Sequence, residues 1–293
     1  MNMEVKRNFL PGDEWMYYKV YLGAESSDHF LTEKLFSLIE YLQNEKIIKS
    51  WFFARFFDPE YHLRIRFKLV DTSNIGELIK LFNENFKYLL DEKYIWKVQL
   101  DTYKRELERY GATRIQLVEE YFHQDSRLML MFLSHIVDNS MNDKHRWLFG
   151  LKCIDSFLTS FGFSLEDKLQ ISENFKQMFY SEFKVDKFQM VAIGNKYRLE
   201  SEVVEQYFDP KDGFELYDSY IESLLDGKRA TDLAFFEKLS NQGDQFNSDE
   251  FIFSILHMGI NRLFKSRNRE YELVLYEFLN RFYQTQIKRK PKN

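Results

Sequence analysis

The hydrophobic pattern of this chain changes at Gly111, and this change limits the folds that the chain can adopt. Before Gly111, short runs rich in aromatic and β-branched residues alternate with apolar residues at helical spacing. After Gly111, helical spacing continues almost to the end and strand signals nearly vanish. Gly and Pro, which interrupt long helices, number only 11 and 4 among 293 residues. We therefore predict an α+β fold with its sheet in the first third of the chain.

Four strands and two helices are predicted before Gly111. The strands are expected at 14–22, 51–57, 62–69 and 95–103, and the helices at 28–42 and 75–90. This order, β-α-β-β-α-β, is that of ferredoxin-like units. The mostly helical region that follows should contain helices at 115–137, 147–161, 165–183, 187–208, 215–225, 231–239, 248–264 and 269–287. We interpret 1–110 and 111–293 as the sheet-bearing and helical parts of a single domain, 1–293.

Charge and cysteine content exclude several classes of protein. The 41 basic and 46 acidic residues give a formal charge of -5, which argues against general nucleic-acid binding, because such binding depends on neutralising phosphates. The single cysteine, Cys153, rules out an internal disulfide and a cysteine-based zinc site. No apolar run approaches the roughly 18 residues of a membrane helix, and the N-terminus lacks an apolar signal region. We expect a cytoplasmic protein that contacts neither a membrane nor nucleic acid directly.

The predicted strand 62–69 carries the densest group of polar side chains. Because side chains alternate between faces, His62, Arg64 and Arg66 share one face, and the apolar residues between them share the other. Two guanidiniums about 7 Å apart on a strand suit a carboxylate or phosphate ligand. A solvated outer face, which is ordinary in an antiparallel sheet, explains the same pattern. The spacing alone leaves both interpretations open.

Two further groups are candidates for chemistry. Glu106 and Arg109 would be neighbours in a helical turn, either in a site or as a surface ion pair that contributes under about 1 kcal/mol. His257 lies in a strongly apolar helical run, as a core residue or as a general acid or base, and Asn261 follows one turn later. No HExxH, CxxC, EF-hand, dinucleotide-binding, P-loop or GxSxG pattern occurs. The remaining candidate is a metal-free reaction that uses arginines, carboxylates and a histidine.

Several segments together resemble a known family. They are FLPGDEW at 9–15, WFFARFFDPEYHLRIRF at 51–67, DTYKRELERYG at 101–111, then Glu119, Phe122-His123, Asp125-Ser126 and HMGINR at 257–262. From about residue 7 to 130 the chain resembles the C-terminal elimination domain of lantibiotic dehydratases, a family that also comprises thiopeptide-type bacteriocin biosynthesis proteins. No large glutamylation domain precedes these segments, so the resemblance leads us to expect a free-standing, split-type elimination protein.

The resemblance implies a dehydration shared by two proteins. In this family, a glutamylation protein uses glutamyl-tRNA to esterify Ser or Thr hydroxyls of a precursor peptide. The elimination protein then acts as a lyase: it removes an α-proton and expels glutamate, which leaves dehydroalanine or dehydrobutyrine, without a metal or organic cofactor. A glutamylated precursor peptide and a glutamylation-domain protein are therefore the expected partners, and the apolar content of 44% would also permit a homodimer.

The functional residues of the family can be placed on this sequence by their motifs. Arg64 and Arg66 match its arginine pair, Glu106 and Arg109 match its Glu-x-x-Arg pair, and His257 matches its C-terminal histidine. We expect these five residues to be catalytic, with the arginines holding the leaving glutamate and His257 acting as base or acid. The residues expected to bind substrate beside them are His62, Arg55, Tyr103, Tyr110 and Asn261.

Two other functions are compatible with the resemblance. The family includes the pyridine synthases of thiopeptide pathways, which join two dehydroalanines by a formal aza-(4+2) cycloaddition and expel the leader peptide. A non-catalytic peptide-binding partner of a dehydratase is the third possibility. The intact set of arginines, Glu106 and His257 favours elimination, because expelling glutamate needs these charges and cycloaddition need not.

Overall fold

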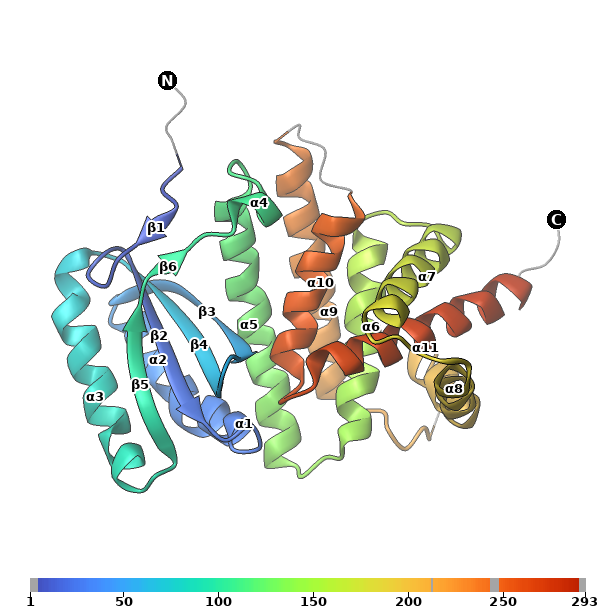
Figure 1. The fold of residues 1–293 in the computed structure, drawn as a ribbon, viewed down its shortest axis with the longest axis horizontal. Coiled ribbons are helices and arrows are strands. Elements are labelled where there is room, and N and C mark those ends of the chain that lie inside the picture. Colours follow the sequence, from blue (N-terminus) through green and yellow to red (C-terminus); the bar gives the residue numbers. More distant parts are fainter. Residues whose placement is uncertain (1–4, 212, 243–247, 290–293) are drawn as a thin grey trace. The chain divides into compact units, whose positions relative to one another are not determined.

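The computed structural model describes residues 5–211, 213–242 and 248–289 and confirms the α+β prediction (Figure 1). The chain forms two compact units. The first consists of residues 1–140 and 261–266, and the second of residues 141–260 and 267–293. Within the described residues, the strands all belong to the first unit, whereas the second unit is helical. That residues 1–293 act as a single domain stays a prediction.

The first unit contains a four-stranded antiparallel sheet. Its strands are β2 (Trp15–Leu22), β3 (Ile48–Phe57), β4 (Tyr61–Leu69) and β5 (Ile95–Asp101), in the spatial order β3-β4-β2-β5. The connecting helices are α1 (Ser27–His29), which continues through a π-helical turn at Phe30–Leu35 into α2 (Phe36–Asn44), and α3 (Ile75–Asp91). The predicted ferredoxin-like order of elements is therefore confirmed.

Two short strands are absent from the sequence-based prediction. They are β1 (Asn8–Phe9) and β6 (Tyr103–Lys104), which pair with each other in an antiparallel ladder. Two residues are too few to show a period of two, so no pattern predicts them. The predicted strand 95–103 is consequently divided: β5 ends at Asp101, and the chain then pairs with the N-terminal segment.

One face of the sheet packs into the core of the first unit. Leu63, Ile65 and Phe67 of β4 are fully buried, as the alternation predicts. From α3, the Phe82 ring stacks on Tyr18 of β2 with centroids 4.1 Å apart. Figure 1 shows α2 and α3 beside the sheet in this unit. The alternate residues of the strands therefore point to the opposite face.

The outer edge of β3 is covered by side chains of α5 (Ile115–Asp138). The Ser126 hydroxyl accepts a hydrogen bond from the backbone N–H of Phe53 at 3.3 Å. Nδ1 of His123 lies 3.0 Å from the backbone oxygen of Trp51. These contacts satisfy backbone groups of an edge strand that would otherwise be open to pairing with another chain.

The segment 261–266 completes the cover of this edge. The Asn261 amide accepts a hydrogen bond from the N–H of Arg55 and donates one to its carbonyl, both at 2.8 Å. Nε of Arg262 donates to the carbonyl of Phe53 at 2.9 Å. Asn261 thus imitates a neighbouring strand at one residue of β3. These contacts explain why Asn261 and Arg262, which are distant in sequence from the sheet, belong to the first unit.

Asn261→Ala is expected to destabilise the first unit. The substitution removes two hydrogen bonds and leaves a buried N–H and a buried carbonyl of Arg55 without partners, which should cost about 2–3 kcal/mol. Urea unfolding followed by circular dichroism measures this change. Asn85→Ala, at an exposed position of α3, is the matched control and should shift the unfolding free energy by less than about 0.5 kcal/mol. Equal effects of the two substitutions would contradict the role of Asn261.

Acid should also weaken the edge of β3. Burial lowers the pKa of His123 below its ordinary value of 6.5, although its bond to the Trp51 backbone opposes this shift. The unfolded chain then binds the proton more readily, so the free energy of unfolding falls as the pH drops below about 6.5 towards the lower, folded pKa. His123→Gln should reduce this pH dependence, measured by urea unfolding between pH 7.5 and 5, and the part that remains includes the buried His62. His29→Gln, at an exposed position, should retain it.

The second unit is built from long helices. Among the described residues these are α6 (Asp143–Ser160), α7 (Leu165–Glu182), α8 (Lys187–Phe208), α9 (Ser219–Ser240), α11 (Asn268–Arg289) and α10 (Asp249–Leu263), whose last three residues belong to the first unit. The starts of two helices follow from sequence: Ser164 with Asp167, and Asp186 with Gln189, form capping boxes. None of the described helices combines the length and the apolar character that crossing a membrane requires.

The predicted division between helices 215–225 and 231–239 is wrong. A single helix, α9, runs from Ser219 through Asp226-Gly227 to Ser240. A glycine inside a helix costs only about 1 kcal/mol, and packing offsets it. In α9, Lys228 forms a buried ion pair with Asp232 one turn later. This pair bridges the position at which the sequence pattern predicts a break.

Candidate functional site

The face of the sheet opposite its core carries the predicted arginines. We call it the arginine face and define it by cross-strand rows. Arg66 pairs with Tyr17 of β2 and Phe52 of β3, and Arg64 pairs with Lys19 and Ala54. Further members are His62, Tyr21, Phe56, Lys97, Gln99 and Asp101. Arg64 and Arg66 are half-buried, whereas the alternate residues Leu63, Ile65 and Phe67 of β4 are fully buried. The predicted common face of the two arginines is confirmed.

Aromatic rings hold both guanidinium groups. Cζ of Arg66 lies 4.6 Å from the ring centroid of Tyr17, 5.0 Å from that of Phe52 and 5.1 Å from that of Tyr103. Cζ of Arg64 lies 3.3 Å from the ring centroid of Phe56. Cation–π contacts of this kind orient a guanidinium without using its N–H donors. The guanidinium donors that make no other hydrogen bond therefore stay available for an anion.

Neither arginine is neutralised by a direct partner. In the part of the chain that the structure describes, no carboxylate forms an ion pair with Arg64 or Arg66, and Nε of Arg66 is buried without a hydrogen-bond partner. Burial holds the pKa of Arg64 below its ordinary value, although the nearby charges of Glu106 and Asp101 oppose this shift. Two half-buried cations with unused donors, close to but not paired with acidic groups, form a site suited to carboxylates.

His62 positions Arg64. It is almost fully buried, and its Nδ1 donates to the backbone carbonyl of Glu60 at 2.9 Å. Nε2 therefore accepts a hydrogen bond from Nε of Arg64, at 3.2 Å. Burial lowers the pKa of His62, and the charge of Arg64 lowers it further. The neutral ring is thus the form that fits this place, where it orients a cation.

Lys19 and Asp101 form an ion pair at 2.5 Å on the arginine face. Burial raises the pKa of Asp101, but hydrogen bonds from Lys19 and from the backbone of Thr102 outweigh it and lower the pKa below its ordinary value. The sequence-based prediction omits both residues. The alternation of strand 14–22 would have placed Lys19 on one face with Tyr17 and Tyr21, and the register of β2 and β4 then sets it beside Arg64.

Glu106 and Arg109 are neighbours, as predicted. Glu106 precedes α4 (Leu107–Tyr110), and Arg109 Nη1 lies 3.2 Å from Glu106 Oε2. Both side chains are about half exposed, so this pair by itself contributes little to stability. Tyr110 is buried, and burial raises its pKa to about 12. The Glu106–Arg109 pair therefore lies at the surface, whereas the ring of the neighbouring Tyr110 is buried.

A buried network fixes the segment between β5 and α4. Tyr103 donates its hydroxyl to Glu119 Oε1 at 2.8 Å. Arg105 donates two hydrogen bonds to the same carboxylate, from Nε at 2.7 Å and from Nη2 at 2.6 Å. Arg105 lies in the recognised motif but has no role in the sequence-based prediction. The network holds Tyr103 against Arg66 and sets the start of α4.

Arg55 and Asn261 lie elsewhere than the arginine face. Arg55 alternates with Phe56 and so belongs to the core face of β3, where it is 2% exposed. Its guanidinium pairs with Asp28 at 2.6 Å. Asn261 bonds the backbone of Arg55, as described above. Arg55 and Asn261 therefore lie away from the arginine face, and that they bind substrate stays a prediction.

His257 belongs to the second unit. Its Nδ1 lies 2.6 Å from Oε1 of Glu272, whose side chain is fully buried, and its ring stacks on Phe253. The prediction leaves His257 without a partner, because Glu272 lies on the next helix along the chain. No periodicity within α10 points to a side chain of α11.

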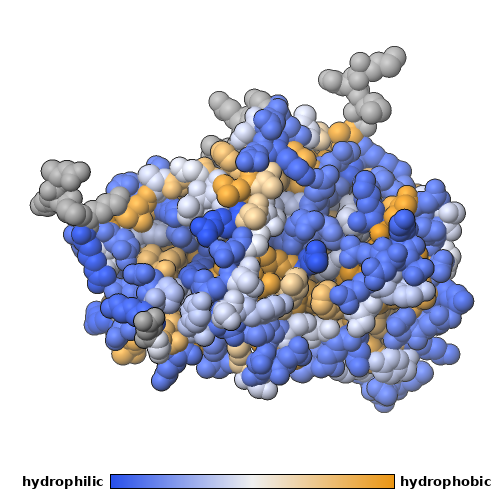
Figure 2. All heavy atoms as spheres, turned by 180° about the vertical axis from the view of Figure 1, so that it is seen from behind, coloured by the Kyte–Doolittle hydropathy of each residue, from blue (hydrophilic) through white to orange (hydrophobic). Residues whose placement is uncertain are grey.

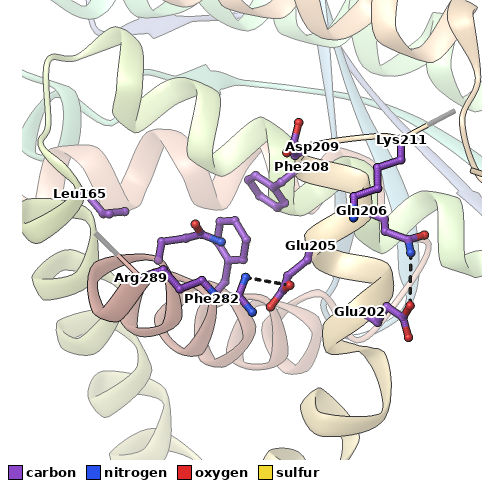
Figure 3. Close-up of a pocket in the computed structure, with 10 residues that line it drawn as sticks. Leu165, Glu202, Glu205, Gln206, Phe208, Asp209, Lys211, Phe282 and Arg289 are labelled. Carbon is purple, nitrogen blue, oxygen red and sulfur yellow. Dashed lines mark hydrogen bonds and ion pairs between the residues drawn. The ribbon is translucent and has the colours of Figure 1, made fainter. Parts of the chain in front are cut away.

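The second unit also contains a pocket of about 620 Å³ (Figure 3). The rings of Phe208 and Phe282 lie 4.3 Å apart in it, and Arg289 pairs with Glu205 across it at 2.9 Å. None of the predicted site residues lines this pocket. Figure 2 shows one face of the molecule, on which hydrophilic residues predominate and apolar residues gather in separate patches. Within residues 5–211, 213–242 and 248–289, no cluster of His, Cys, Asp and Glu is suited to a metal ion.

Sequence comparisons relate the chain to lantibiotic biosynthesis. The model of the family described as lantibiotic biosynthesis dehydratase C-term matches residues 15–283. The subtilin biosynthesis protein SpaB of Bacillus subtilis is 27% identical over 274 residues, which are 90% of this chain and 25% of SpaB. The nisin biosynthesis protein NisB of Lactococcus lactis subsp. lactis is 29% identical over 140 residues, 46% of this chain and 13% of NisB. The chain thus spans a quarter or less of these curated relatives.

Solved structures share the fold. The tRNA-dependent lantibiotic dehydratase MibB from Microbispora sp. 107891 has a TM-score of 0.71 at 17% identity, over 96% of this chain and 29% of MibB. TsrL has a TM-score of 0.64 at 13% identity, over 94% of this chain and 95% of TsrL. The pyridine synthase TbtD from thiomuracin biosynthesis has a TM-score of 0.59 at 9% identity, over 93% of this chain and all of TbtD. At these identities the likeness is one of fold.

Proposed function

The chain belongs to the lantibiotic biosynthesis dehydratase C-terminal family, and from this premise we propose that it eliminates glutamate from glutamylated Ser or Thr residues of a ribosomally made precursor peptide. The products are dehydroalanine and dehydrobutyrine, and the chain is a lyase. The observation that carries this proposal is the pair of half-buried guanidiniums, Arg64 and Arg66, that lack carboxylate partners among the described residues.

The chemistry of the leaving group matches two arginines. A glutamyl ester made from glutamyl-tRNA is joined through its α-carboxyl group, so the side-chain carboxylate is already charged when the reaction begins. The second carboxylate appears only as the Cβ–O bond of the substrate breaks. One guanidinium can bind the existing charge, and the other can stabilise the charge that develops in the transition state. Glu106 interacts electrostatically with Arg64. In this proposal its carboxylate either binds the free ammonium group of the glutamate or orients an arginine.

The partners follow from the same reaction. A glutamylation-domain protein would supply the ester, and the glutamylated precursor peptide would be the substrate. In this proposal tRNA meets only the glutamylation protein, in keeping with the charge of -5. The free-standing form, the single elimination-type domain of residues 1–293, the cytoplasmic location and a homodimer stay proposals.

A two-substrate assay tests the proposed function. The chain is given a glutamylated precursor peptide, and the released glutamate and the dehydrated peptide are followed by mass spectrometry. It is then given a peptide that already carries dehydroalanines. Elimination predicts glutamate release in the first reaction and no macrocycle in the second. Peptide binding with neither product would identify a non-catalytic partner and overturn the proposal.

The pyridine synthase is the second candidate. The observation that favours it is the likeness of fold to TbtD, which the chain covers over its whole length. Formation of a macrocycle from the dehydroalanine peptide, together with release of its leader, would establish this function instead. Cycloaddition has no leaving glutamate to bind, so it gives no reason for two unpaired guanidiniums among aromatic rings.

A further inference from the structure

His257 is held by a carboxylate from another helix of the second unit. Its Nδ1 lies 2.6 Å from Oε1 of Glu272, on α11. The Glu272 side chain is fully buried, whereas that of His257 is 21% exposed. A hydrogen bond this short between an imidazole and a carboxylate is typical of a charge-assisted contact. One end of the imidazole is therefore fixed, and the ring still reaches solvent.

A second contact brings a cation to Glu272. Nη1 of Arg269, one turn earlier on α11, lies 3.4 Å from Oε2 of Glu272. Arg269 is itself bound to Glu182 of α7 through Nε, at 3.1 Å, and through Nη2. A buried carboxylate is stable as an anion only when a cation or hydrogen bonds accompany it, and here Arg269 and His257 supply both.

The position of the Glu272 carboxylate indicates which nitrogen of His257 carries the proton. A carboxylate only accepts hydrogen bonds, so Nδ1 must be the donor. In the neutral ring, Nε2 then holds the lone pair. No described residue makes a hydrogen bond to Nε2. Phe253, one turn earlier on α10, stacks on the ring with centroids 6.0 Å apart and restricts its rotation.

We propose that Glu272 is a positioning residue, which holds the proton of His257 on Nδ1 and so makes Nε2 the general base of the elimination. This inference rests on the proposed function. The Cα–H bond of the esterified residue breaks and its proton moves to Nε2. The electron pair of the Cα–H bond forms the Cα=Cβ double bond, the Cβ–O bond breaks, and glutamate leaves as a carboxylate with the electron pair of the Cβ–O bond. Glu272 then neutralises the imidazolium, as a carboxylate does for histidine in hydrolytic triads.

The tautomer can be measured without activity. In protein labelled with nitrogen-15 histidine, long-range proton–nitrogen spectra above pH 7 distinguish a protonated Nδ1 from a protonated Nε2, and the His257→Ala variant identifies the signals. We expect His257 to carry its proton on Nδ1 in the unsubstituted chain. A proton on Nε2 would overturn the inference whatever the chain catalyses.

Kinetics with a matched control test the role of the charge. Glu272→Gln should slow glutamate release about 10²-fold or more with little change in KM, because a general base contributes about 10²–10⁴-fold. Glu277→Gln is the control: Glu277 is also buried on α11, but it bonds Tyr180 and Arg281 instead of His257. It should stay within about threefold of the original rate, and Glu272→Asp should recover part of the loss.

The outcomes separate the inference from the function. An unchanged rate in Glu272→Gln, or equal losses in Glu272→Gln and Glu277→Gln, would overturn the positioning role, because the first shows no role and the second a structural one. If Glu272→Gln fails to fold, the tautomer of the unsubstituted chain and the rate of Glu272→Asp still decide. If the unsubstituted chain releases no glutamate, the proposed function fails, while the tautomer spectrum reports separately on the arrangement of Glu272 and His257.

Discussion

Arg64→Ala is expected to halt dehydration at the glutamylated peptide. Removing a cationic donor that stabilises developing charge lowers kcat by about 10²–10³-fold, or about 2.7–4 kcal/mol. Arg64 meets this description because it is half-buried, is oriented by Phe56 and His62, and has no ion-pair partner among the described residues. Mass spectrometry should show the glutamyl ester accumulating while the dehydrated product almost disappears. Arg66→Ala should behave in the same way.

Lys80→Ala is the control for loss of positive charge. Lys80 lies on α3, beside the other face of the sheet, and its side chain is 72% exposed. Its loss changes the net charge as much as Arg64→Ala does, but it leaves the arginine face intact. Normal dehydration by Lys80→Ala, with arrest in Arg64→Ala, would locate the effect in the arginine face. Normal dehydration by Arg64→Ala would contradict the proposed anion site.

His257→Ala should give the largest loss of activity. The substitution removes the only proposed proton acceptor, and a general base contributes about 10²–10⁴-fold to rate. Glutamylated peptide should accumulate as in Arg64→Ala, but binding of that peptide should be retained, because the arginines are still present. Binding by fluorescence anisotropy and turnover by mass spectrometry distinguish the two variants. Full conversion to dehydrated product by His257→Ala would reject its catalytic role.

Much of the sheet is predictable because each strand carries its own signal. The period of two in residues 62–69 predicts both the buried residues Leu63, Ile65 and Phe67 and the opposite placement of Arg64 and Arg66. The same reasoning predicts that Glu106 and Arg109 are neighbours. In each case the interacting residues are close in sequence, so local geometry alone brings them together.

The sequence does not reveal contacts between segments that are far apart along the chain. Asn261 is 206 residues from the backbone of Arg55, and no pattern within its helix indicates that its amide covers a strand. Glu272 joins His257 only because two helices pack together. Arg55 is a further case: the motif does not indicate that its guanidinium lies in the core and pairs with Asp28, because Asp28 belongs to a distant helix.

The covered edge of β3 has a consequence for how a peptide can be recognised. Because side chains of α5 and of the segment 261–266 occupy the backbone groups of Phe53 and Arg55, an extended peptide cannot join the sheet there as an additional strand. A substrate then gains no register from main-chain pairing at this edge. Under the proposed function, the charged glutamyl group would then be what the arginine face recognises. Such a site would tolerate varied residues around the modified Ser or Thr, and one site could serve several positions along the same peptide.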